Sequence, residues 1–160
     1  MKSIWAPWRS EYIGSEKPES CLFCDVSGTE QKEGCYVLFS GSVSIVMLNK
    51  YPYTGGHLMI APKRHIAGLD ELSPEESIDI FRLMRVSTVA LTSEISPDGF
   101  NVGMNLGKTA GAGIEDHLHM HVVPRWEGDT NFMPVLSGTK VLSVHLEETY
   151  DRLKPLFERI

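Results

Sequence analysis

Residues 116–126 read Asp-His-Leu-His-Met-His-Val-Val-Pro-Arg-Trp, which places three histidines at two-residue spacing, at His117, His119 and His121. Successive side chains of a β-strand point to opposite faces, so this spacing predicts three imidazoles on one face, with neighbours roughly 6–7 Å apart. The intervening Leu, Met and Val side chains then point into a core. A single phosphate group can meet two imidazoles on such a strand, so the stretch indicates both a fold element and a functional site.

The histidine pattern has two alternatives to phosphate chemistry. Single histidines on strands are usually hydrogen-bonded structural residues, but three on one face each need a polar partner of their own when buried. Imidazole is also a common zinc ligand, so a metal site made by all three histidines is a second alternative. The pattern therefore favours a functional strand over a purely structural one.

The bulk properties of the chain exclude several classes of protein. Its 160 residues, 42% hydrophobic and 22% charged, are typical of one soluble globular domain. No apolar run approaches the roughly 20 residues that span a bilayer, and the N-terminus lacks the apolar core of a signal peptide, so we expect a cytoplasmic protein. The net charge of −6 argues against binding nucleic acid through backbone electrostatics. Any phosphate binding is therefore expected in a local pocket.

The remaining patterns along the chain predict an α+β fold, with an antiparallel β-sheet and helices packed on it. Residues 14–34 are expected to form a loop. Ser73 as N-cap, Pro74 at the first position and Glu76 three residues after the cap predict a helix that runs to about Ser93. A second amphipathic helix is expected near the C-terminus, bent or ended by Pro155. The strands are expected at residues 35–39, 43–48, 57–61 and 100–105 and at the histidine stretch.

The stretch His117-Leu118-His119-Met120-His121-Val122-Val123 resembles the His-φ-His-φ-His-φ-φ signature of the histidine triad (HIT) superfamily. Asn49 and residues 56–58, 62–65 and 105–107 support the resemblance, which covers nearly all of the chain. It implies a single HIT domain over residues 1–160. Its parts are an N-terminal segment (1–34), a core with the triad strand (35–126) and a C-terminal segment (127–160). Residues 5–9, 111–116 and 124–126 most resemble the dinucleoside tetraphosphate phosphorylase branch.

The resemblance implies an enzyme that cleaves dinucleoside polyphosphates such as diadenosine tetraphosphate. His119 would attack the α-phosphate and form a covalent nucleotidyl intermediate, and His121 would donate to the phosphate oxygens. Inorganic phosphate or water would then resolve the intermediate; phosphorolysis is the first expectation. A HIT hydrolase or purine nucleoside phosphoramidase is the alternative within enzymes, and a non-catalytic nucleotide-binding scaffold is the alternative of another class. The family commonly forms homodimers through a helix and a strand.

The resemblance also implies nucleotide contacts, at Asn49, Asn105, Gly107, Gly111, Gly113 and Trp126. Asn49 would bind the ribose hydroxyls, and Asn105 would orient a phosphate or the leaving group. The glycine-rich loop 107–113 would bring backbone amides close to the phosphates. Trp126 is expected either to stack on a base or to be a buried structural residue. Gly113 stands where the hydrolase and phosphoramidase branches carry Gln, so the phosphate contacts of those branches do not transfer to this chain.

Cys21 and Cys24 have the two-residue gap with which a pair of thiolates grips one tetrahedral metal. The resemblance adds His65 and His117, which would complete a Cys₂His₂ set around a structural zinc ion. A thioredoxin-like redox role is disfavoured, because no helix start is predicted after the pair. His57 lies in a predicted strand, where a structural role is favoured over a functional one.

Overall fold

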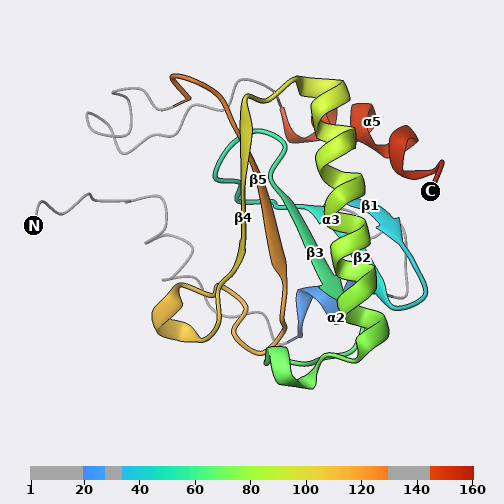
Figure 1. The fold of residues 1–160 in the computed structure, drawn as a ribbon, viewed down its shortest axis with the longest axis vertical. Coiled ribbons are helices and arrows are strands. Elements are labelled where there is room, and N and C mark those ends of the chain that lie inside the picture. Colours follow the sequence, from blue (N-terminus) through green and yellow to red (C-terminus); the bar gives the residue numbers. More distant parts are fainter. Residues whose placement is uncertain (1–19, 28–33, 130–144) are drawn as a thin grey trace, which may run out of the picture.

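The computed structural model describes residues 20–27, 34–129 and 145–160, and its architecture is the predicted α+β fold (Figure 1). Within these residues, an antiparallel sheet has five strands in the order β1-β2-β3-β5-β4. The strands are β1 (Val37–Ser40), β2 (Ser44–Leu48), β3 (Leu58–Pro62), β4 (Gly99–Met104) and β5 (Met120–Arg125). The helices are α2 (Leu22–Ser27), α3 (Pro74–Ile95) and α5 (Leu146–Phe157), with short 3₁₀ turns at Leu69–Glu71 and Lys108–Ala110. Residues 5–9, which contribute to the resemblance, lie outside the described residues.

The long helix α3 begins where its sequence predicts. The Ser73 side chain accepts a hydrogen bond from the Glu76 amide at 3.1 Å, and the Glu76 carboxylate accepts one from the Ser73 amide at 2.8 Å. This reciprocal pair satisfies two backbone donors that the first turn leaves without helical partners. The helix ends at Ile95, two residues later than expected, and Ser96 then takes a left-handed conformation with φ of 45°.

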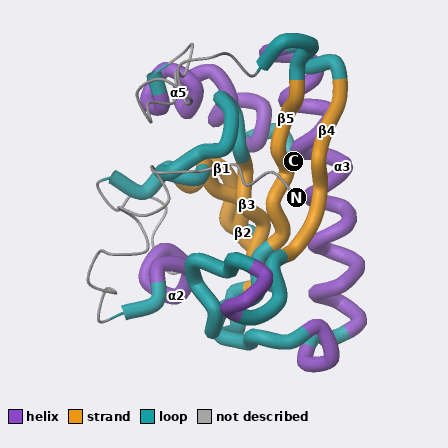
Figure 2. Tube along the Cα trace, turned by 90° about the vertical axis from the view of Figure 1, so that its left-hand side faces the viewer, coloured by secondary structure: helices purple, strands orange, loops and turns teal. Residues whose placement is uncertain are grey.

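Helices lie on both sides of the sheet. Figure 2 shows α3 on one side of the strands and α2 on the other. The α3 side holds the larger core, which is completed by α5 where that helix packs against β1 and α3. A second cluster of buried residues on the other side joins α2 to the sheet and consists of Phe23, Val26, Val37, Ile45, Met47, Met59 and Ala61. No helix in the described residues is both long and apolar enough to cross a membrane.

One local expectation is wrong, and one of the two alternatives for Pro155 is excluded. Residues 22–27 form the helix α2 inside the expected loop, because Phe23 and Val26 recur at helical spacing and are both fully buried. The Cys pair therefore lies at the start of a helix. The argument against a thioredoxin-like redox role, that no helix begins at the pair, no longer holds. Pro155 does not end the C-terminal helix, which continues to Phe157.

Candidate active site and metal centre

The histidine triad spans the entry into strand β5, which lies between β3 and the edge strand β4. The strand begins at Met120, so His117 and His119 precede it, while His121 lies within it. His119 and His121 are adjacent, with ring centroids 4.8 Å apart. Both are buried, at 5% and 9% exposure. The imidazole of His117 instead lies against Cys21 and Cys24, so it faces the predicted metal site.

His119 has the geometry of a nucleophile. Its Nδ1–H donates to the backbone carbonyl of His117 at 2.8 Å, which leaves the lone pair on Nε2. Burial lowers the pKa of His119 against the opposing effect of that hydrogen bond, so the ring stays neutral near pH 7. A neutral imidazole with a fixed tautomer and an unprotonated Nε2 is the form that attacks phosphorus.

His121 contacts a fourth histidine, His57, for which the sequence favoured a structural role. Nε2 of His57 lies 2.9 Å from Nδ1 of His121. His57 is fully buried beside Tyr53, whose ring stacks on it at a centroid distance of 4.7 Å. The two histidines are 64 residues apart in the chain, so no local pattern indicates their contact.

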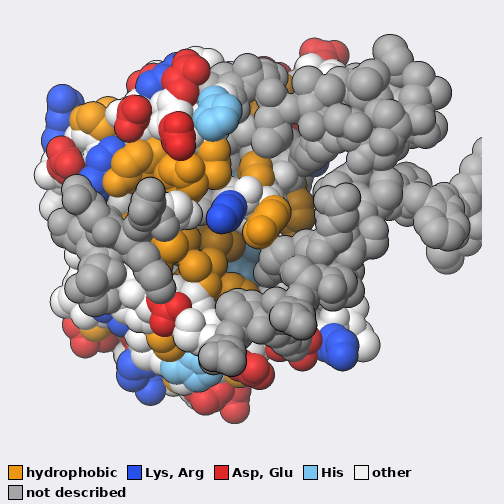
Figure 3. Space-filling view, turned by 180° about the vertical axis from the view of Figure 1, so that it is seen from behind, with side chains coloured by type: hydrophobic (Ala, Val, Ile, Leu, Met, Phe, Trp, Pro, Cys, Tyr) orange, Lys and Arg blue, Asp and Glu red, His pale blue; other side chains and the backbone are white. Residues whose placement is uncertain are grey.

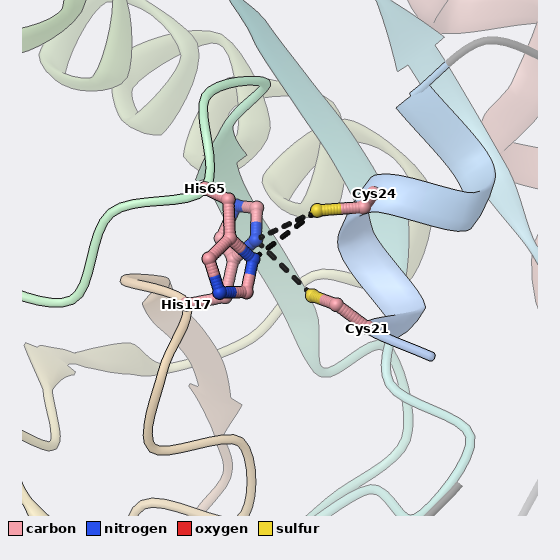
Figure 4. A group of neighbouring side chains, drawn as sticks. All are labelled: Cys21, Cys24, His65 and His117. Carbon is pink, nitrogen blue, oxygen red and sulfur yellow. Dashed lines mark hydrogen bonds between the residues drawn. The ribbon is translucent and has the colours of Figure 1, made fainter. Parts of the chain in front are cut away.

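The predicted metal ligands come together beside the triad, as Figure 4 shows. Sγ of Cys21 lies 3.2 Å from Nδ1 of His117, and Sγ of Cys24 lies 3.2 Å from Nδ1 of His65 and 3.7 Å from Nδ1 of His117. All four candidate ligand atoms lie within 4.8 Å of one another. A tetrahedral zinc ion holds sulfur and nitrogen ligands about 3.5 Å apart, given its usual bond lengths. The cluster therefore has the size and the donor set of a zinc site.

The protonation state of His117 also suits a bound cation. Nε2–H of His117 donates to the carbonyl of Pro62 at 2.8 Å, so the Nδ1 lone pair faces the thiols. Burial lowers the pKa of His117 and so favours the neutral, ligating form. Desolvation raises the pKa of the Cys24 thiol, and the hydrogen bond and charge of the neighbouring Cys21 raise it further. A bound cation would reverse that effect and stabilise both thiolates.

Phe23 connects the cluster of Cys and His side chains to His119. It lies between the two cysteines in the chain, and its ring centroid is 5.0 Å from that of His117 and 5.0 Å from that of His119. The side chain is fully buried. The helix α2, which carries Cys24, is thus packed directly against the expected nucleophile.

The glycine-rich loop 107–113 connects β4 to the triad. Gly107 and Gly111 have φ of 78° and 85°, a left-handed backbone that other residues rarely adopt. Nδ2 of Asn105 donates to the carbonyl of Gly111 at 3.3 Å and so braces the loop. Gly107 and Gly113 are exposed, which leaves the loop backbone open to a ligand.

Asn49 and Trp126 each have structural contacts. Oδ1 of Asn49 accepts from the Tyr51 amide at 2.9 Å, and its Nδ2 lies 3.3 Å from Nδ1 of His57. Trp126 donates its indole N–H to the carbonyls of Ile95 and Ser96, at the C-terminal end of α3. Trp126 follows His121 by five residues along β5, roughly 17 Å of extended chain. Their expected nucleotide contacts stay predictions.

The face opposite α3 has a recessed surface. Figure 3 shows hydrophobic side chains gathered around a hollow on this face, with a histidine side chain visible at its floor. His121 pairs with Met59 of β3 and Gly103 of β4, so it lies on an inner strand of the sheet. The triad therefore occupies a sheltered position with limited access to solvent.

Comparison with known proteins agrees with this arrangement. The HIT domain family model matches residues 31–128. The chain is 35% identical to AP-4-A phosphorylase of Mycobacterium tuberculosis over 93% of its own length and 80% of that protein. It is 33% identical to the adenosine 5'-monophosphoramidase hnt1 of Schizosaccharomyces pombe, over 66% of this chain and 74% of that one. A zinc-bound histidine triad family protein from Mycobacterium smegmatis matches with a TM-score of 0.70 and 25% identity, covering 88% of this chain and 94% of the other. The chain is therefore a member of the HIT domain family.

Proposed function

We propose that this protein is a nucleotidyltransferase that cleaves dinucleoside polyphosphates through a covalent intermediate on His119. The observation that carries the proposal is the hydrogen bond from Nδ1 of His119 to the His117 carbonyl, which leaves Nε2 unprotonated. His121 lies beside it with a ring that can donate to a phosphoryl oxygen. Similarity to AP-4-A phosphorylase over most of the chain supports this substrate class.

The reaction would proceed in two displacements at one phosphorus. Nε2 of His119 forms a bond to the α-phosphorus, and the bridging P–O bond breaks with its electron pair on the departing nucleoside polyphosphate. An oxygen of inorganic phosphate then forms a P–O bond as the P–N bond breaks, which releases a nucleoside diphosphate. His121 would donate a hydrogen bond to the phosphoryl oxygen while negative charge builds there. Two inversions give overall retention of configuration at phosphorus.

The nucleotide would lie across the recessed face of the sheet. Amides of the loop at Gly107 and Gly113 would bind phosphate oxygens, and Asn105 would hold the loop in place. The Gly111 amide already donates to the carbonyl of Lys108 at 3.0 Å, so this glycine would shape the loop instead. Asn49 would contribute to ribose binding, and Trp126 would contact a base only if the nucleotide reaches the far end of β5. These assignments rest on the loop geometry and on the family resemblance.

Product analysis separates the proposed reaction from its alternatives. Diadenosine tetraphosphate is incubated with and without inorganic phosphate, and the nucleotides are separated by chromatography. We expect ATP and phosphate-dependent ADP. AMP formed without a phosphate requirement would favour a hydrolase, and tight binding without turnover would favour a nucleotide-binding scaffold. His119→Ala should lose turnover, whereas His145→Ala, at an exposed histidine outside the site, should retain it.

We propose further that Cys21, Cys24, His65 and His117 hold a structural zinc ion, which fills all four tetrahedral positions with protein ligands. Bound there, zinc would brace α2 and the start of β5. Thiolate ligands of this kind persist in a reducing compartment, which agrees with a cytoplasmic location. Elemental analysis of the purified protein tests the site, and Cys24→Ser should lower the zinc content. Less than a stoichiometric amount in wild type would count against the assignment.

The outer surface of α3 suits a homodimer interface. Large apolar side chains on it are well exposed, at Ile78, Phe81 and Val89. The edge strand β4 adds an exposed Val102 and an unpaired edge within the described residues. We propose that two copies associate through these elements. Light scattering of the wild-type protein should give twice the mass of one chain. The Phe81→Glu variant should give the mass of one chain. A monomeric wild-type protein would refute the proposed dimer.

A further inference from the structure

His57 is placed where it can control the proton of His121. It follows the turn before β3, and β3 pairs with β5 so that Met59 lies opposite His121. His57 is thus a diagonal neighbour of His121 across the two strands. Its Nε2 reaches Nδ1 of His121 at 2.9 Å, and both side chains are buried.

The loop before β3 decides which nitrogen of His57 carries the proton. The backbone N–H of Tyr53 donates to Nδ1 of His57 at 3.1 Å. A backbone amide can only donate, so Nδ1 must hold a lone pair. Nδ2 of Asn49 also faces that Nδ1 at 3.3 Å, and its orientation is settled because Oδ1 of the same amide accepts from the Tyr51 amide. The backbone N–H of Asn49 donates to the backbone carbonyl of His57 at 2.9 Å and closes the loop.

The proton positions then follow one from another. With Nδ1 accepting, the neutral ring of His57 carries its proton on Nε2, and this N–H donates to Nδ1 of His121. His121 therefore carries its own proton on Nε2. We propose that His57 is a positioning residue that holds His121 as the Nε2–H tautomer. The backbone N–H of Tyr53 fixes the tautomer of His57, and His57 in turn fixes that of His121.

The tautomer matters because the two ring nitrogens of His121 have opposite roles. The Nε2–H form presents a donor to a phosphoryl oxygen, whereas the Nδ1–H form presents a lone pair that repels it. Stacking by the Tyr53 ring, at an interplanar angle of 30°, holds the plane of His57 and so the direction of its N–H. This inference rests on the proposed nucleotidyl transfer for its catalytic consequence, but the tautomer itself can be measured without turnover.

Two substitutions at His57 separate positioning from simple packing. In His57→Asn the amide group occupies the place of Nδ1, so it can accept from the Tyr53 amide but cannot reach His121. In His57→Gln the amide group occupies the place of Nε2 and can still donate to Nδ1 of His121. We expect His57→Asn to lower kcat by about 10- to 100-fold with little change in KM, as when a residue that orients a reacting imidazole is lost. His57→Gln should restore most of kcat. Equal activity of the two variants would overturn the proposal.

Nitrogen-15 NMR of the histidine rings in the purified wild-type protein tests the proton order directly. The expected result is a protonated Nε2 and an unprotonated Nδ1 in both His57 and His121. In His57→Asn the ring of His121 should exchange between tautomers, and in His57→Gln it should resemble wild type. A proton on Nδ1 of His121 in wild type would overturn the proposal even if the variants do not fold. Absence of turnover in wild type would instead refute the proposed function and leave the NMR result decisive for the tautomer.

Discussion

Truncation of Phe23 tests whether the proposed zinc site and the proposed nucleophile His119 both depend on the packing of this side chain. The ring is fully buried and lies 5.0 Å from the rings of both His117 and His119. Removal of a buried Phe side chain costs about 3–5 kcal/mol in an ordinary core. The helix α2 has six residues, too few to be stable alone, so it depends on the packing of Phe23 and Val26. We therefore expect Phe23→Ala to release α2 locally and to weaken zinc binding.

The size of the effect follows from that packing energy. Each loss of about 1.4 kcal/mol raises Kd tenfold, so Phe23→Ala should raise the zinc Kd by about 100-fold or more. Phe23→Leu keeps much of the apolar volume and should raise it by about 10-fold. Competition against a chromophoric chelator measures Kd, in parallel with kcat/KM, which should fall because His117 supplies the carbonyl that orients His119.

A matched control uses Phe157, which is similarly buried but belongs to the core on the α3 side. Phe157→Ala should lower Tm without changing the zinc Kd. The proposed connection is wrong if Phe23→Ala binds zinc as tightly as wild type, or if Phe157→Ala loses zinc to the same degree. A wild-type protein that binds no zinc would instead refute the proposed zinc site itself.

Three further predictions concern pH and backbone conformation. Burial lowers the pKa of His119 below its ordinary 6.5, so kcat/KM should hold at pH 6.5 and fall only at lower pH, as a proton occupies Nε2; an acid limb above 6.5 in the pH–rate profile would contradict this. The Arg64 hydrogen bonds lower the pKa of Glu76 from 4.5 to about 2, so the ionised carboxylate stabilises the fold above pH 4.5 and this contribution is lost as pH falls toward 2. Glu76→Gln should lower the free energy of unfolding by about 2 kcal/mol at pH 7 in urea denaturation, a value reduced because Arg64 faces solvent. A difference from wild type that does not shrink toward pH 2 would reject the assignment. Gly111→Ala should lower stability by about 1–2 kcal/mol because φ is 85°, whereas Gly113→Ala should cost less; equal shifts in Tm would contradict the role of φ.

Features with a local cause could be predicted from the sequence. The start of α3 follows from Ser73 and Glu76, whose hydrogen bonds join residues three apart. The strand that carries His121 follows from the two-residue alternation of polar and apolar side chains. The spacing of Cys21 and Cys24 predicted a metal site, the family resemblance added His65 and His117, and the structure brings all four candidate ligands together. Each of these features depends on neighbouring residues or on a pattern that the family shares, so each could be anticipated without the tertiary structure.

The helix α2 shows where local patterns are insufficient. Its six residues include no strong helix signal, and the helix is stabilised by the burial of Phe23 and Val26 against the sheet. Trp126 is a similar case, because its indole N–H is satisfied by carbonyls at the end of α3, about 30 residues earlier in the chain. Tertiary packing decides both, and no window of sequence contains the partners.

The sequence by itself determined the class of fold, the family, and the residues that could attack a phosphate or hold a metal. The tertiary structure alone decided which contacts orient each imidazole: Nδ1 of His117 faces Cys21, Nδ1 of His119 donates to the His117 carbonyl, and Nδ1 of His121 lies against Nε2 of His57. The physical reason is that a tautomer depends on which group lies within about 3 Å of each ring nitrogen. That group is set by the pairing of β3 with β5, which joins segments far apart in the chain.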